Sequence, residues 1–150
     1  MAHKMLWLIL GGGLLVWLDQ IVKAYFWRPY QNISDAGVIK WPTWITQHSN
    51  HGISFGIELP YYLSVGLMVA FLLLLFWWLF QLNMRHPLMI AGLILSLSGG
   101  IGNLIDRINL GFVRDFVALS KWLPIFNLAD VLVVSGVILI LWSIYRHGRT

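Results

Sequence analysis

The sequence predicts a mainly α-helical membrane protein with four transmembrane helices and a small outer-face β-sheet between the first and second helices. The composition is the first reason: 59% of residues are hydrophobic, 11% are charged and the mean hydropathy is +0.75, far more apolar than a soluble domain of this size. Second, the apolar residues form four runs long enough to cross a bilayer. Third, one long polar segment separates the first two runs. The 150 residues fit a single domain, 1–150, and a soluble enzyme with a large core is excluded by the runs.

The first predicted span covers residues 5–27. Lys4 stands before the apolar run as in a signal peptide, but no small-residue cleavage site follows. The run contains Asp19 and Lys23, which are four residues apart and therefore lie on one helical face, where they can pair. At this point an ordinary ion pair near the outer end of the helix and a functional pair are both open.

Residues 28–60 form the longest polar segment. Residues 38–47 are rich in β-branched and aromatic side chains with partial alternation, which indicates a small sheet at the membrane interface. Aromatic residues would hold it at headgroup level; they are Tyr25, Trp27, Tyr30, Trp41, Trp44, Tyr61 and Tyr62. Residues 48–56 are expected to form a loop of this sheet, because Asn50, Gly52 and Gly56 permit tight backbone geometry.

The second and third predicted spans cover residues 61–80 and 88–105. The second carries no charge and is expected to be a lipid-facing helix. In the third, Gly92, Ser96 and Gly100 recur every four residues, and such a small-residue face allows close helix packing. Ser96 shares a side with Asn103, so we expect Asn103 to point into the bundle and to make an interhelical hydrogen bond.

The stretch 99–130 holds three of the six acids in an otherwise apolar part of the chain. Asn109 to Gly111 is predicted to be a turn, followed by an extended piece over residues 112–117. On an extended piece Asp115 shares a face with two valines, and this desolvation predicts a raised pKa for its carboxyl group.

The fourth predicted span covers residues 126–145. Asn127 and Asp130 are three residues apart and share a helix face near its entrance. Four spans place both termini on one side. That side carries Lys4, Arg85, Arg146 and Arg149 without acids. The positive-inside rule therefore favours cytoplasmic termini, with the polar residues toward the outer face.

Two aspartates near the mouth of a helix bundle suggest acid–base chemistry. Such a pair cannot ionise fully at low cost, so one member holds a proton while the other acts as base and activates water. Asp115 and Asp130 are separated by a loop, which permits their encounter without requiring it. The chain has no Cys, and its five His lack metal-ligand spacing, so no thiol, metal or cofactor is expected.

Five motifs occur in order along the chain. They are DQIVK at 19–23, NHGISF at 50–55, GGIGNLIDR at 99–107, GFVRDF at 111–116 and FNLAD at 126–130. Together with the apolar spans between them, they resemble lipoprotein signal peptidase, the type II signal peptidase of bacteria. The resemblance covers nearly the whole chain.

This resemblance implies an aspartic endopeptidase of the bacterial inner membrane with four helices and an outer-face β-cradle. It implies cleavage of diacylglyceryl-modified prolipoproteins just before the lipidated cysteine, contact with membrane lipids and inhibition by globomycin. By position, Asp115 and Asp130 would be the catalytic dyad. The supporting residues would be Asn50, Gly52, Asn103, Arg107 and Asn127. Asp19 and Lys23 would be structural or substrate-positioning, and Asp106 would serve local structure next to Arg107 in a turn.

The competing class is a non-enzymatic membrane protein, such as a transporter or assembly factor, that uses the same acids for proton or ion passage. It would need polar residues along the spans, yet the second span has none and the polar groups cluster at one end. That favours an enzyme reached from one surface. The net charge of +4 does not indicate a nucleic-acid partner, because the cations are scattered near the ends of apolar runs.

Overall fold

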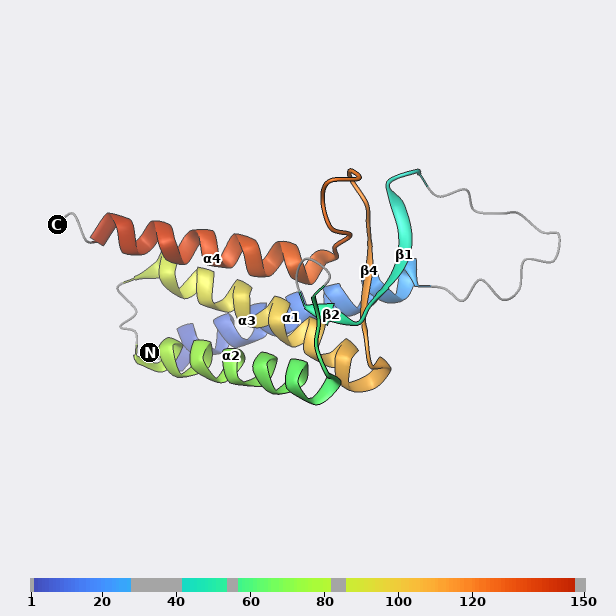
Figure 1. The fold of residues 1–150 in the computed structure, drawn as a ribbon. Coiled ribbons are helices and arrows are strands. Elements are labelled where there is room, and N and C mark those ends of the chain that lie inside the picture. The colour runs from blue at the N-terminus through green and yellow to red at the C-terminus, as the bar shows by residue number, and fades with distance from the viewer. Residues whose placement is uncertain (1, 28–41, 54–56, 82–85, 148–150) are drawn as a thin grey trace.

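The computed structural model describes residues 2–27, 42–53, 57–81 and 86–147, and its framework is a bundle of helices. Four helices in this part of the chain are long and apolar enough to cross a membrane. They are α1 (Ala2–Phe26), α2 (Tyr61–Gln81), α3 (Pro87–Leu110) and α4 (Leu128–His147). The strands gather at one end of the bundle, opposite the end where α1 begins and α4 ends (Figure 1). The predicted fold class is confirmed.

Helix α3 lies at the centre of the bundle and packs against the other three helices. Its small residues make this possible: a Cβ on Gly92 would lie 2.7 Å from the carbonyl oxygen of Gly136 in α4. Gly100 does not belong to this contact, because a Cβ there would meet Leu72 of α2 instead. Steps of four residues drift around a helix of 3.6 residues per turn, so the predicted stripe turns from α4 toward α2.

The end of α3 differs from the prediction. The helix continues to Leu110 rather than ending near residue 105, so Asp106 and Arg107 lie within it and not in a turn. Only Gly111 makes the turn, with φ of 82° and its N–H bonded to the carbonyl of Arg107 at 3.0 Å. Glycine adopts this left-handed conformation without steric cost, which ends the helix at this point.

The strands form two small antiparallel sheets. One pairs β1 (Ile45–Asn50) with β4 (Val113–Val117), and the other pairs β2 (Gly52–Ile53) with β3 (Ile57–Glu58). The sheet material between the first two helices is therefore confirmed, but the partner of β1 comes from the segment after α3.

The expected loop over residues 48–56 is wrong in its described part, because residues 48–50 belong to β1 and residues 52–53 to β2. Residues 48–50 have a turn-like sequence, but they form a strand because pairing with β4 satisfies their backbone groups. The predicted strand residues 38–41 and Gly56 lie outside the described residues.

A short bridge closes the segment between β4 and α4. The N–H of Phe126 donates to the carbonyl of Val117 at 3.1 Å, and the N–H of Val117 donates back to Phe126 at 2.9 Å. This closure returns the chain to β4 just before α4 begins. It therefore brings Asp115, in the strand, toward Asp130, in the first turn of the helix.

Candidate active site

Asp130 is fixed in the first turn of α4 by a reciprocal pair of hydrogen bonds. The Asn127 side-chain oxygen accepts from the N–H of Asp130, and the Asp130 Oδ2 accepts from the N–H of Asn127, both at 3.0 Å. This is the geometry of a capping box, which satisfies two N–H groups left free by the helix start. Asp19 of α1 caps a third, because its Oδ1 accepts from the N–H of Ala129 at 2.9 Å.

Asp115 lies in β4 and is fully buried. Both of its oxygens accept hydrogen bonds: Oδ1 from the side-chain amide of Asn127 at 2.6 Å and Oδ2 from that of Asn50 at 2.9 Å. Asn127 thus contacts both aspartates, Asp115 through its amide nitrogen and Asp130 through its side-chain oxygen and backbone N–H. The two predicted acids therefore form hydrogen bonds with the same asparagine.

The environment of Asp115 changes its protonation. Burial is the largest cause and the nearby charge of Asp130 the second, and together they raise the pKa of Asp115 from 3.8 to about 6. The hydrogen bonds from Asn50 and Asn127 act in the opposite direction without cancelling the effect. The raised pKa predicted from the apolar face of this strand is confirmed.

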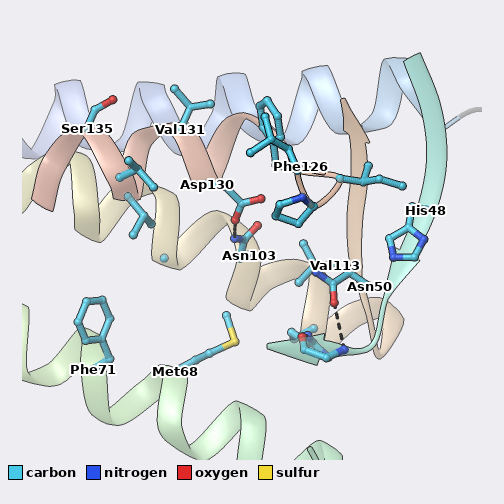
Figure 2. Close-up of a pocket in the computed structure, with 18 of the residues that line it drawn as sticks. His48, Asn50, Met68, Phe71, Asn103, Val113, Phe126, Asp130, Val131 and Ser135 are labelled. Atoms are coloured by element: carbon cyan, nitrogen blue, oxygen red, sulfur yellow. Dashed lines mark hydrogen bonds between the residues drawn. The ribbon is translucent and has the colours of Figure 1, made fainter. Parts of the chain in front are cut away.

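Asn103 connects the bundle to the aspartates. It points inward from α3, and its amide nitrogen donates to Oδ1 of Asp130 at 2.8 Å (Figure 2). Its side-chain oxygen accepts from the Lys23 ammonium at 2.8 Å and from the Asn127 amide at 3.2 Å. The predicted interhelical hydrogen bond is confirmed.

Asp19 and Lys23 form the predicted ion pair. The Lys23 ammonium lies 2.9 Å from Oδ2 of Asp19, and both side chains are 0% exposed. The same ammonium lies 3.6 Å from Oδ2 of Asp106. The pair is therefore buried between α1 and α3 rather than located on a solvated helix end.

Arg107 holds the chain after β1. Its guanidinium donates to the backbone carbonyls of His51, at 2.6 Å, and of Gly52. The Gly52 N–H in turn donates to the side-chain oxygen of Asn50 at 3.0 Å (Figure 2). Arg107 and Gly52 thus act on the site by fixing the chain directly after Asn50, the last residue of β1.

A further polar cluster was not predicted from the sequence. Arg114 of β4 donates to Asp106 through its Nε at 3.1 Å, its Nη2 at 2.7 Å and its backbone N–H at 3.0 Å, and also donates to Gln20 at 2.8 Å. The cluster ties β4 to α3 and α1. The signal that could have found it is strand alternation, which turns Arg114 to the face opposite Asp115.

A cavity of about 1000 Å³ is lined by Asp130, while Asp115 is buried behind it and is not among the lining residues. Its walls are mostly apolar and come from α2, α4 and the segment before α4, while His48, Asn50, Asn103 and Asp130 make one end polar (Figure 2). Met68 and Phe71 of α2 line it, so the second helix faces more than lipid, contrary to the prediction. Such a cavity can accept an apolar chain with its polar backbone near the carboxylates.

The donor set around the aspartates suits carboxylates rather than a metal. Their four oxygens accept from asparagine amides and one backbone N–H. Among the described residues, no three His, Cys, Asp or Glu side chains group in a way that could hold a metal ion. The site therefore presents two carboxyl groups that share one asparagine.

A bundle of membrane-length helices with a buried polar site at one end fits a multi-pass membrane protein. The family model described as signal peptidase (SPase) II matches residues 7–146. Relatives named lipoprotein signal peptidase include one from Moorella thermoacetica, 34% identical over 87% of each chain. Another is from Clostridioides difficile, 38% identical over 83% of this chain and 85% of that protein.

Solved structures agree. A bacterial membrane enzyme determined by the in meso method at 2.3 Å resolution has a TM-score of 0.77 and 28% identity, and the match covers 94% of this chain and 88% of that one. A second, at 1.9 Å, has a TM-score of 0.73 and 29% identity, covering 91% of each chain. The chain belongs to the signal peptidase II family and is a peptidase.

Proposed function

We propose that this protein removes signal peptides from prolipoproteins, with Asp115 and Asp130 as its catalytic pair. The observation that carries the proposal is the bridge made by Asn127, which joins Asp130, in the wall of a large and mostly apolar cavity, to the buried Asp115. The relatives named lipoprotein signal peptidase support the choice of substrate. The proposed reaction uses no metal and no cofactor.

In the proposed reaction one carboxyl of the pair is ionised and the other is protonated. The ionised carboxylate takes a proton from a water molecule, and the water oxygen attacks the scissile carbonyl carbon. The protonated carboxyl gives its proton to the carbonyl oxygen. When the tetrahedral intermediate collapses, the carboxyl that took the proton from water gives it to the leaving nitrogen and the C–N bond breaks. The other carboxylate takes a proton back from a hydroxyl of the intermediate, which restores the pair. A pKa of about 6 suits Asp115 to this exchange, since it gains and loses a proton near neutral pH.

The supporting residues keep the pair in position. Asn50 and Asn103 donate to Asp115 and Asp130, respectively, and stabilise whichever carboxyl is ionised. Arg107 holds the chain directly after Asn50. None of these groups needs to move a proton itself.

The proposed substrate carries a diacylglyceryl group, and cleavage falls just before the lipidated cysteine. Two acyl chains anchor a peptide stably in a bilayer, and apolar walls from α2 and α4 give such chains a surface beside the carboxylates. We place the protein in the bacterial inner membrane, among lipids, with both termini cytoplasmic and the strands at the outer face. Globomycin should inhibit the cleavage.

The test is cleavage of a lipidated prolipoprotein in detergent by the parent, Asp115→Asn and Asp130→Asn. Each substitution removes a proton carrier with little change in shape, and each should lower kcat by about 10²–10⁴-fold or more. Asp106→Asn is the control, because it removes a buried carboxylate that binds Arg114, and its loss of kcat should be milder. Turnover like the parent's by either dyad variant would overturn the assignment.

A further inference from the structure

Three asparagine amides surround the aspartates, and each turns its NH₂ group toward a carboxylate oxygen. An amide can do this reliably only when its oxygen is held on the other side. For Asn50 the holding donor is the N–H of Gly52, and for Asn127 it is the N–H of Asp130, both at 3.0 Å. Both donors belong to the backbone, so local chain geometry sets these two orientations.

Asn103 is held differently. Its oxygen accepts from the Lys23 ammonium at 2.8 Å, while its nitrogen donates to Asp130 at 2.8 Å. An ammonium has three donors and no acceptor, so the atom of Asn103 that faces it must be the oxygen. The Asn127 amide also reaches this oxygen, at 3.2 Å, but it lies closer to Asp115, at 2.6 Å.

Lys23 is itself firmly placed. It is 0% exposed, and its other contacts are Asp19 at 2.9 Å and Asp106 at 3.6 Å. Three acceptor oxygens thus surround its three N–H donors, and its charge is paired, as a buried charge must be. Lys23 lies behind Asn103 and is not part of the cavity wall.

We propose that Lys23 is a positioning residue for the catalytic pair: its ammonium fixes the Asn103 amide so that the nitrogen donates to Asp130. The inference rests on the proposed function of Asp115 and Asp130. Without the ammonium, Asn103 can turn its oxygen toward Asp130, and an ionised Asp130 then loses a donor. Because Lys23 does not line the cavity, its loss should act on kcat and leave KM unchanged.

Removal of Lys23 alone would leave Asp19 buried without its cation, so the test uses Asp19→Asn as the background. The amide introduced by this substitution keeps a side-chain oxygen for the N–H of Ala129. Asp19→Asn/Lys23→Met has the net charge of the parent, and methionine approximates the length of the lysine stem. Relative to Asp19→Asn, we expect kcat for the lipidated prolipoprotein to fall about tenfold, equivalent to about 1.4 kcal/mol, with KM unchanged.

A double-mutant cycle that combines Lys23→Met with Asn103→Ala decides whether Lys23 acts through Asn103. In the background that carries Asn103→Ala, Lys23→Met should lower kcat no further, with single-turnover measurements used for slow variants. Side-chain amide NMR with labelled asparagine gives a second readout, independent of turnover. On Lys23→Met the side-chain amide resonance of Asn103 should change its chemical shift, and that of Asn50 should keep its chemical shift.

The outcomes separate the two proposals. If the parent does not cleave the lipidated substrate, or if Asp115→Asn does, the proposed function fails. If the parent cleaves but Lys23→Met lowers kcat equally with and without Asn103, Lys23 does not act through that residue. An unmoved Asn103 signal would overturn the inference in the same way, even where turnover is too slow to measure.

Discussion

Asp115 should make the protein less stable as pH rises, and Asp115→Asn should remove that dependence. The pKa of this carboxyl is about 6 in the fold against 3.8 for a free aspartic acid, because burial disfavours its charged form. Between these values the folded chain binds more protons than the unfolded chain. Its free energy of unfolding therefore falls as pH rises through this window, and the full loss is present above the folded pKa.

The size of the effect follows from the two pKa values. At 1.36 kcal/mol per pKa unit, the difference corresponds to about 3 kcal/mol in total, of which about 2 kcal/mol falls between pH 4 and pH 8, because a free aspartic acid is already partly ionised at pH 4. An asparagine at 115 does not titrate, although its NH₂ must face one of the amides that now donate to Asp115, which costs about 1 kcal/mol at every pH. The difference in free energy of unfolding between the variant and the parent should therefore shift in favour of the variant by about 2 kcal/mol from pH 4 to pH 8.

The assay is unfolding in detergent at pH 4 to 8, followed by tryptophan fluorescence. Val117→Ala, on the same strand, serves as the control, since it removes no titratable group and should lower stability equally at all pH values. Parallel pH curves for the parent and Asp115→Asn would refute the reasoning, because they would mean that Asp115 ionises in the fold as easily as in the unfolded chain.

Four further outcomes are expected. A lipidated substrate should be cleaved with a much higher kcat/KM than the same peptide without lipid, since remote binding energy holds the scissile bond in place; comparable values would contradict this. Activity should survive EDTA and thiol alkylation, and a loss that one divalent metal restores would exclude the proposed mechanism. Reporter fusions after Thr150 and within residues 81–87 should report cytoplasm, and those within 35–40 the outer side; the reverse pattern would put the site on the wrong face. Gly136→Ala should cost about 1–3 kcal/mol, because its Cβ would lie 2.5 Å from the carbonyl oxygen of Gly92, whereas Gly66→Ala, which meets nothing within 4 Å, should be neutral in thermal unfolding.

Helical periodicity carried most of what the sequence could predict. The pairing of Asp19 with Lys23 and the inward direction of Asn103 depend on residues four or seven apart, and helix geometry places such residues on one face. The raised pKa of Asp115 also followed from a local pattern, the alternation of a strand. These features need no knowledge of the rest of the fold.

Contacts between distant segments could not be predicted in this way. Asn50 and Asp115 are 65 residues apart, and the pairing of β1 with β4 that joins them leaves no signal in either segment alone. The same holds for Arg107, whose partners are carbonyls 55 and 56 residues away. A turn-like sequence became a strand at residues 48–50 because its partner lies in another part of the chain.

The opposite directions of Arg114 and Asp115 have a consequence for assembly of the enzyme. A slip of β4 by one residue would turn Asp115 toward Asp106 and bring Arg114 to the amide groups of Asn50 and Asn127. Two buried acids would then face each other without Arg114 between them. The guanidinium of Arg114 would meet the NH₂ groups of Asn50 and Asn127, which are donors like itself. The register that satisfies the ion pairs is also the one that builds the acid pair. With Asp115 and Asp130 as the proposed catalytic pair, a chain with a shifted strand would be both less stable and inactive, so cleavage would begin only in molecules whose strand has the register described here.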